Sequence, residues 1–139
     1  MAYRIYLVDD DRFLLDLYAI KFKNAGHDVS VFNGGEDLLA ALRKEDAPVP
    51  SAILLDVIMP GMSGFEILDT IRKEGLAKGA KFIILSNQGQ DSDFEKAKEL
   101  SVDGYIIKAS AIPSEVLTET IRTIEGGAQQ GGGELPIHQ

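Results

Sequence analysis

The sequence predicts a single α/β domain with a doubly wound parallel sheet, and two observations lead to that fold class. Short apolar runs alternate with longer stretches in which apolar residues recur every three to four positions, the pattern of strands followed by helices. The connections are short and rich in turn-forming residues, as at Asn24 and Gly26. Right-handed crossovers leave few other topologies for such a series, and 139 residues amount to about one domain.

Five apolar runs are expected to be strands. Several are apolar on both faces, as parallel strands covered by helices on both sides are. In chain order they are Arg4 to Val8, His27 to Phe32, Ser51 to Leu55, Lys81 to Leu85 and Gly104 to Ile107.

Five helices are expected to follow these strands, each with an apolar stripe that faces the core rather than a ligand. The first stripe is Phe13, Leu14, Leu17, Tyr18 and Phe22; the second is Leu38, Leu39 and Leu42; the third is Phe65, Ile67, Leu68 and Ile71. The fourth helix covers Asp91 to Leu100 with Phe94, Ala97 and Leu100 on one side, and the fifth carries Val116, Leu117, Ile121 and Ile124.

The folded domain is expected to span residues 1–125, followed by a flexible tail or linker over residues 126–139. After Glu125 the composition changes to a run dominated by glycine and glutamine. Glycine loses the most conformational entropy on ordering, and nothing in this run can build a core.

Composition excludes several classes of protein. The formal net charge is −8, with no cluster of basic residues, which argues against direct binding to nucleic acid or to anionic membranes. There is no long apolar run and no signal-peptide pattern, so we expect a cytoplasmic protein. Without cysteine, and with His27 and His138 far apart in sequence, any metal must be held by oxygen ligands.

Polar residues of functional types directly follow four of the expected strands. They are Asp9, Asp10 and Asp11 after the first, Asp56 after the third, Ser86 after the fourth and Lys108 after the fifth. Doubly wound sheets bind ligands beyond the carboxyl ends of their strands, so these side chains are expected at one edge. Taken singly, each has an ordinary structural explanation as a helix cap, a turn residue or a surface lysine.

Their joint placement favours a phosphoryl-transfer site. Asp9, Asp10 and Asp56 supply three carboxylates to one hard cation, which suits Mg²⁺. Phosphorylation of Asp56 would then need a hydroxyl and an ammonium for the phosphoryl oxygens, and Ser86 and Lys108 carry these groups.

These stretches resemble the receiver domain of bacterial two-component response regulators over roughly Tyr3 to Ile124. The matching segments are Leu-Val-Asp-Asp at 7–10, Leu-Leu-Asp-Val-Ile-Met-Pro-Gly-Met-Ser-Gly at 54–64, Ile-Leu-Ser at 84–86 and Gly-Tyr-Ile-Ile-Lys at 104–108. The resemblance implies a flavodoxin-like, five-stranded parallel sheet in the order 2-1-3-4-5 with helices on both faces, an order for which the chemotaxis regulator is a standard example.

The resemblance also implies a role for each residue. Asp56 is the phosphoacceptor, Asp9 and Asp10 hold Mg²⁺ with the backbone carbonyl of Ile58, and Ser86 and Lys108 bind the phosphoryl group. Tyr105 is the aromatic residue that changes position with Ser86, turning inward on phosphorylation.

The protein implied is a signalling switch, not an enzyme acting on separate substrates, although it assists its own phosphorylation and dephosphorylation. Its partners would be a histidine kinase or phosphotransfer protein, and a downstream protein that binds the face formed by the fourth helix, fifth strand and fifth helix.

Two positions depart from the family pattern. Ala109 follows Lys108 where receivers usually have a proline, often in a cis bond, and a cis bond to alanine costs several kcal/mol. Asn87 stands after Ser86 where a small residue is usual, and its amide either crowds the phosphoryl group or donates to it.

Two other functions remain open. A haloacid-dehalogenase-type phosphatase also uses an aspartate nucleophile, Mg²⁺, Ser/Thr and Lys, and the run from Asp9 to Asp11 satisfies its Asp-x-Asp pattern, but it leaves Asp56 unexplained. A phosphorylation-independent interaction module is hard to reconcile with a full set of phosphorylation residues.

Overall fold

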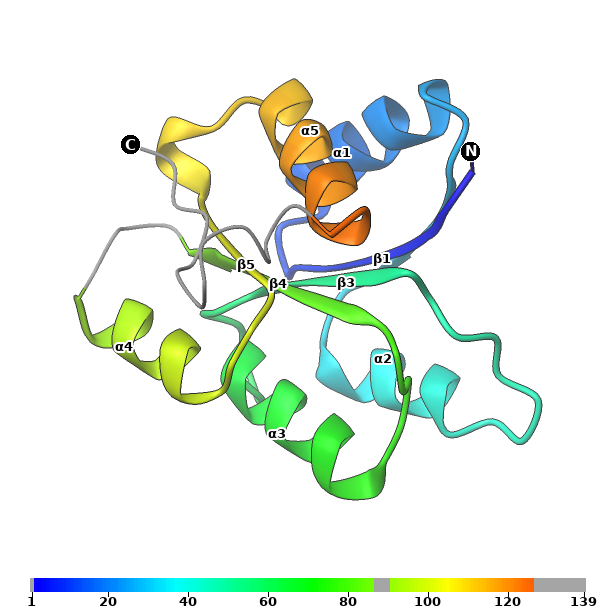
Figure 1. Ribbon diagram of the computed structural model, residues 1–139, viewed down its shortest axis with the longest axis vertical. Helices are drawn as coiled ribbons and strands as arrows, with labels where there is room; N and C mark the ends of the chain where they lie inside the picture. Colours follow the sequence, from blue (N-terminus) through cyan, green and yellow to red (C-terminus); the bar gives the residue numbers. More distant parts are fainter. Residues whose placement is uncertain (1, 87–90, 127–139) are drawn as a thin grey trace.

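The computed structural model describes residues 2–86 and 91–126, which form one parallel sheet with helices on both faces (Figure 1). The strands are β1 Arg4–Val8, β2 Asp28–Phe32, β3 Ala52–Asp56, β4 Lys81–Ser86 and β5 Gly104–Ile107. The helices are α1 Arg12–Asn24, α2 Gly35–Leu42, α3 Gly64–Glu74, α4 Asp91–Glu99 and α5 Pro113–Ile124, with a short 3₁₀ turn over Lys108–Ser110. The strand order is β2-β1-β3-β4-β5, so the expected flavodoxin-like order 2-1-3-4-5 is confirmed.

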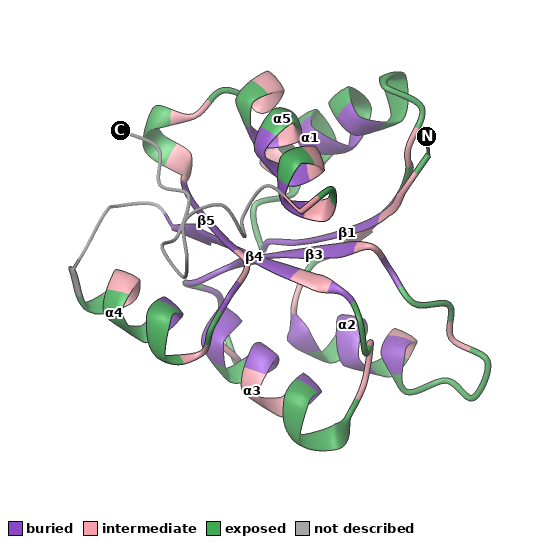
Figure 2. Cartoon of the chain, in the orientation of Figure 1, coloured by how far each residue is buried: buried purple, intermediate pink, exposed green. Residues whose placement is uncertain are grey.

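The core consists of two apolar layers, one on each face of the sheet. Figure 1 shows α1 and α5 on one face and α2, α3 and α4 on the other. Alternate residues of each strand point to opposite faces, so Ile5 and Leu7 pack toward α1 and α5, whereas Tyr6 and Val8 pack toward α2 and α3. Strands β1, β3, β4 and β5 are accordingly buried along most of their length (Figure 2), as runs that are apolar on both faces predict. The edge strand β2 is mostly half-buried, and only its Val29 is buried.

The strand boundaries differ slightly from those expected. β3 and β4 each continue one residue further, through Asp56 and Ser86, because Asp56 pairs with Leu85 and Ser86 pairs with Ile107 across the sheet. β2 begins at Asp28 rather than at His27, whose N–H instead donates to a carbonyl at the end of α1. The functional side chains at these positions are therefore held by the sheet ladder and not by loops.

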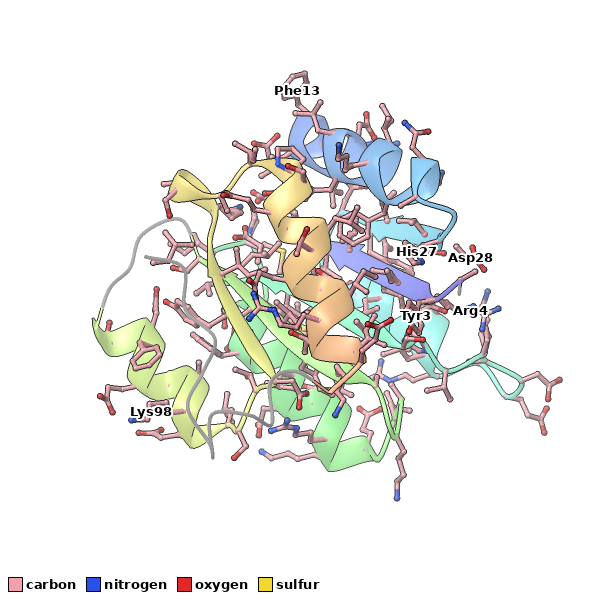
Figure 3. All side chains as sticks on the ribbon, turned by 45° about the horizontal axis from the view of Figure 1, so that its top comes forward. Tyr3, Arg4, Phe13, His27, Asp28 and Lys98 are labelled. Carbon is pink, nitrogen blue, oxygen red and sulfur yellow. The ribbon has the colours of Figure 1, made fainter. Side chains whose placement is uncertain are left out.

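The stripe expected on α1 is partly wrong. Leu15, Tyr18, Ala19 and Phe22 form the buried face, whereas Phe13 is 74% exposed and Leu17 is 39% exposed. Phe13 projects into solvent from the start of α1 (Figure 3). The sequence contains enough apolar residues for two adjacent stripes, and only packing on the sheet selects between them.

The face that α5 buries also differs from its apolar stripe. Val116 is buried as expected, but its buried neighbours are Glu119, Thr120 and Thr123, while the apolar residues of the stripe beyond Val116 are only half-buried. The hydroxyls of Thr120 and Thr123 donate to carbonyls one turn earlier, at 2.7 and 2.8 Å. These bonds within the helix make the polar face compatible with burial.

The stripes of α2 and α3 are confirmed, since every residue expected in them is buried. Asn87 and the tail expected over residues 126–139, apart from Gly126, lie outside the described residues. No helix in the described part of the chain is both long enough and apolar enough to cross a membrane.

Candidate functional site

The strand ends bring the predicted site residues to one edge of the sheet. Asp9 directly follows β1, Asp56 and Ser86 are the last residues of β3 and β4, and Lys108 directly follows β5. All four side chains are largely buried, with Asp9, Asp56 and Ser86 exposed by only 1%, 2% and 1%. These four residues thus form a largely buried polar cluster at the edge of the sheet.

Three carboxylates meet at this edge. Asp9, Asp10 and Asp56 each present an oxygen, and these oxygens all lie within 4.8 Å of one another. Asp9 and Asp56 are buried, whereas Asp10 is exposed. Asp11 takes no part in this cluster: its side chain accepts a hydrogen bond from the N–H of Leu14 at 3.2 Å and caps α1, the structural role considered for it above.

Lys108 is the cation of the site. Its Nζ lies 2.9 Å from Asp9 Oδ2 and 3.0 Å from Asp56 Oδ1. Burial opposes the charged form of Lys108, but the two carboxylates outweigh burial and raise the pKa of the lysine. One ammonium facing three carboxylates leaves the site with surplus negative charge.

Asp56 is the acid of this site whose pKa the surroundings raise. Burial raises the pKa of Asp56 to about 6, with a further contribution from Asp9, while Lys108 acts in the opposite direction. Although Lys108 Nζ is close to Asp56 Oδ1, the geometry does not make a hydrogen bond, and this buried oxygen has no hydrogen-bond partner among the described residues.

The site therefore fits a hard divalent cation. Its donors are carboxylate oxygens, its net charge is negative, and one buried carboxylate oxygen lacks a hydrogen bond. Ile58 lies two residues beyond Asp56 with an exposed side chain, and its carbonyl as a fourth ligand stays a prediction.

The two residues expected to switch lie on β4 and β5, and both are fully buried. Ser86 Oγ donates to Asp93 Oδ2 on α4 at 3.5 Å. The Tyr105 ring packs edge-on against Phe94, with 5.7 Å between centroids and an interplanar angle of 89°. Burial raises the pKa of the Tyr105 hydroxyl, and the nearby Ser86 hydroxyl moderates the rise, although the tyrosine makes no well-aligned hydrogen bond to the described residues. Tyr105 thus already occupies the inward position, and an outward position stays a prediction.

Gly64 and Asp93 lie at the site but were not singled out from the sequence. A Cβ on Gly64 would lie 2.3 Å from the carbonyl oxygen of Asp56, so only glycine lets α3 begin against the end of β3. A Ser63–Glu66 capping box fixes that helix start, and its Ser-x-x-Glu spacing is visible in the sequence. No spacing in the sequence points to Asp93, because its contact with Ser86 depends on how α4 packs beside the end of β4.

The peptide bond between Lys108 and Ala109 is trans, as are all the others in the described residues. With Ala109 in the place where receivers usually have a proline, Lys108 Nζ still contacts both buried acids, Asp9 and Asp56.

Comparisons with known proteins identify the family and the fold of this chain. The family model for the response regulator receiver domain matches residues 5–122. The alkaline phosphatase synthesis transcriptional regulatory protein PhoP of Bacillus subtilis is 32% identical over 118 residues, covering 84% of this chain and 46% of that protein. This chain spans about half the length of the curated relatives it matches.

Solved structures show the same fold. The response regulator DrrB, described as a Thermotoga maritima OmpR/PhoB homolog, gives a TM-score of 0.74 at 30% identity, covering 90% of this chain and 54% of DrrB. TrrA of Thermotoga maritima, solved in complex with Mg²⁺ and BeF, gives 0.70 at 25% identity, covering 88% of this chain and 98% of that chain.

Proposed function

Because this chain belongs to the response regulator receiver domain family, we propose that it is a signalling switch that accepts a phosphoryl group on Asp56 with Mg²⁺ bound. The observation that carries this proposal is the placement of Asp56. Its carboxylate is buried, lies 3.0 Å from Lys108 Nζ, and shares a cluster with the carboxylates of Asp9 and Asp10.

The residues of the chain divide the reaction between them. A carboxylate oxygen of Asp56 forms the new bond to phosphorus, while the bond to the donor's leaving group breaks and its electron pair leaves with that group. Lys108 exchanges part of its pairing with Asp56 for a phosphoryl oxygen, and the Ser86 hydroxyl donates to another.

Mg²⁺ would be held by Asp9, Asp10, Asp56 and the carbonyl of Ile58, and when bound it neutralises charge on the phosphoryl oxygens. The similar protein TrrA was solved in complex with Mg²⁺ and BeF, which supports Mg²⁺ as the cation proposed for this chain. Loss of the phosphoryl group to water would return Asp56 to its free form, assisted by the same residues.

The proposed partners follow from the same function. A histidine kinase or phosphotransfer protein would supply the phosphoryl group in the cytoplasm, and a downstream protein would bind the face made by α4, β5 and α5. The transcriptional role in the name of PhoP belongs to a protein about twice as long as the matched region, and we assign no direct nucleic-acid contact to this domain.

The phosphatase alternative has less support. The family match runs through all five strands and includes Asp56, which that alternative leaves without a role. An interaction module that needs no phosphorylation would not require a lysine buried between two acids at a strand edge.

The test is phosphorylation by acetyl phosphate, with the product followed by intact-protein mass. We expect labelling of the parent that is lost when Mg²⁺ is removed with EDTA, no labelling of Asp56→Asn, and normal labelling of Asp46→Asn, which removes an exposed loop carboxylate. Stable labelling of Asp9 in the Asp56→Asn variant would overturn the assignment and favour the phosphatase.

A further inference from the structure

Asp93 of α4 faces the hydroxyl that the phosphoryl group would need. Ser86 Oγ donates to Asp93 Oδ2 at 3.5 Å. Burial is the main cause of the raised pKa of the neighbouring Tyr105 hydroxyl, and the Asp93 carboxylate adds to the rise. The carboxylate is thus close enough to both switch residues to act on them.

A serine hydroxyl has one proton to donate. To donate it to a phosphoryl oxygen on Asp56, Ser86 must give up the bond to Asp93. A distance of 3.5 Å is long for a hydroxyl–carboxylate hydrogen bond, so the contact is weak enough for a phosphoryl oxygen to compete with it. The contact nevertheless stabilises only the form in which Ser86 is turned toward α4.

The first turns of α4 are held in place beside the switch. Phe94, the next residue, packs edge-on against the Tyr105 ring at 5.7 Å. Asp93 also lines a cavity between α3 and α4, together with Ser63, Glu66 and Lys96, so its side chain has space to move away from Ser86.

We propose that Asp93 is a positioning residue that acts as a brake on the switch, by holding the Ser86 hydroxyl away from the phosphoryl site until phosphate competes for it. The proposal rests on the function proposed above and adds its regulation. A ligand shifts a two-state equilibrium only by its differential affinity, so a contact present in one state alone sets how much phosphoryl affinity is needed to switch.

The test is a titration of the full chain with beryllofluoride and Mg²⁺, a phosphoryl mimic, followed by NMR. Asp93→Ala removes the hydrogen bond to Ser86, so it should lower the half-saturating concentration of beryllofluoride about threefold or more. A change of this size is in the range of coupling between residues in contact. Asp93→Asn should shift it in the same direction by less, because the amide still accepts a hydrogen bond but carries no charge. Glu95→Ala, which removes an exposed acid from the same helix, should leave it unchanged.

A double-mutant cycle with Ser86→Ala separates the brake from other effects. If Asp93 acts through the serine hydroxyl, Asp93→Ala should change nothing in the Ser86→Ala background. The same shift in both backgrounds would mean that Asp93 acts by charge repulsion or by stabilising the start of α4, and would overturn the proposal. No saturable binding to the parent, together with no labelling of Asp56, would instead overturn the proposed function, and the brake with it.

Discussion

Asp10 is the exposed member of the carboxylate cluster, and this sets it apart from Asp9. Asp9 already accepts hydrogen bonds from Lys108 at 2.9 Å and from the N–H of Asp11 at 3.0 Å, whereas Asp10 faces solvent. We therefore expect Asp10→Ala to weaken Mg²⁺ binding more than Asp9→Ala, and Asp9→Ala to destabilise the fold more, because it removes one partner of a buried lysine. Mg²⁺ titrations and urea unfolding of both variants test this division, and equal losses of Mg²⁺ affinity would contradict it.

Asp56 is a carboxylate that the fold stabilises in its protonated form. Its pKa of about 6 lies above the ordinary 3.8, so between these values the folded state binds a proton that the unfolded state lacks. Lowering the pH from 7 toward 4 therefore removes a cost to folding of up to about 3 kcal/mol.

Without Mg²⁺, Asp56→Asn should accordingly raise the free energy of unfolding at pH 7.5, and the gain should shrink toward pH 4.5. Urea unfolding in EDTA at the two pH values measures this, with Asp46→Asn as the exposed control. A variant less stable than the parent at pH 7.5 would show that the pairing of Asp56 with Lys108 outweighs its burial. In the parent, Mg²⁺ affinity should fall as the pH drops through about 6, because the metal needs the ionised carboxylate.

At the scale of elements, the start of α3 and the end of β3 form one tight junction. Because a Cβ on Gly64 would overlap the Asp56 carbonyl, Gly64→Ala should destabilise the protein by about 1–3 kcal/mol, the usual cost of overpacking. It should also slow phosphorylation, since the displaced residue is the phosphoacceptor itself. The matched control is Gly34→Ala at the start of α2, where a Cβ meets no atom within 4 Å. Similar free energies of unfolding for both variants would contradict the close packing of Gly64 against the Asp56 carbonyl.

The helix α1 gives a second comparison at this scale, because its two phenylalanines have opposite surroundings. Phe22 is 0% exposed and Phe13 is 74% exposed. Phe22→Ala should cost about 3–5 kcal/mol, the range for a buried phenylalanine, whereas Phe13→Ala should change stability little. Thermal or urea unfolding distinguishes the two, and a large loss for Phe13→Ala would show that its ring is covered in solution.

For the whole molecule, the described core closes with α5, which ends at Ile124. Removing residues 127–139 should leave the melting temperature and the phosphorylation of Asp56 nearly unchanged, because this segment has little apolar surface to bury. Differential scanning calorimetry of the shortened chain checks this, and a clear fall in melting temperature would contradict it.

The sequence by itself determined the fold class, and it indicated which polar residues would meet at the proposed phosphoryl site. Periodicity is a local property, so it located the five strands to within one residue at each end and placed an apolar stripe within each of the five helices. The parallel sheet then required that residues following the strands, such as Asp9, Asp56 and Lys108, meet at one edge.

Only the tertiary structure decided how helices rotate and what touches across elements. The exposure of Phe13, the buried polar face of α5, the close approach at Gly64 and the contact of Asp93 with Ser86 each depend on how one element packs against another. The physical reason is that residue type and spacing encode local conformation, whereas these features come from side-chain packing between segments far apart in the chain.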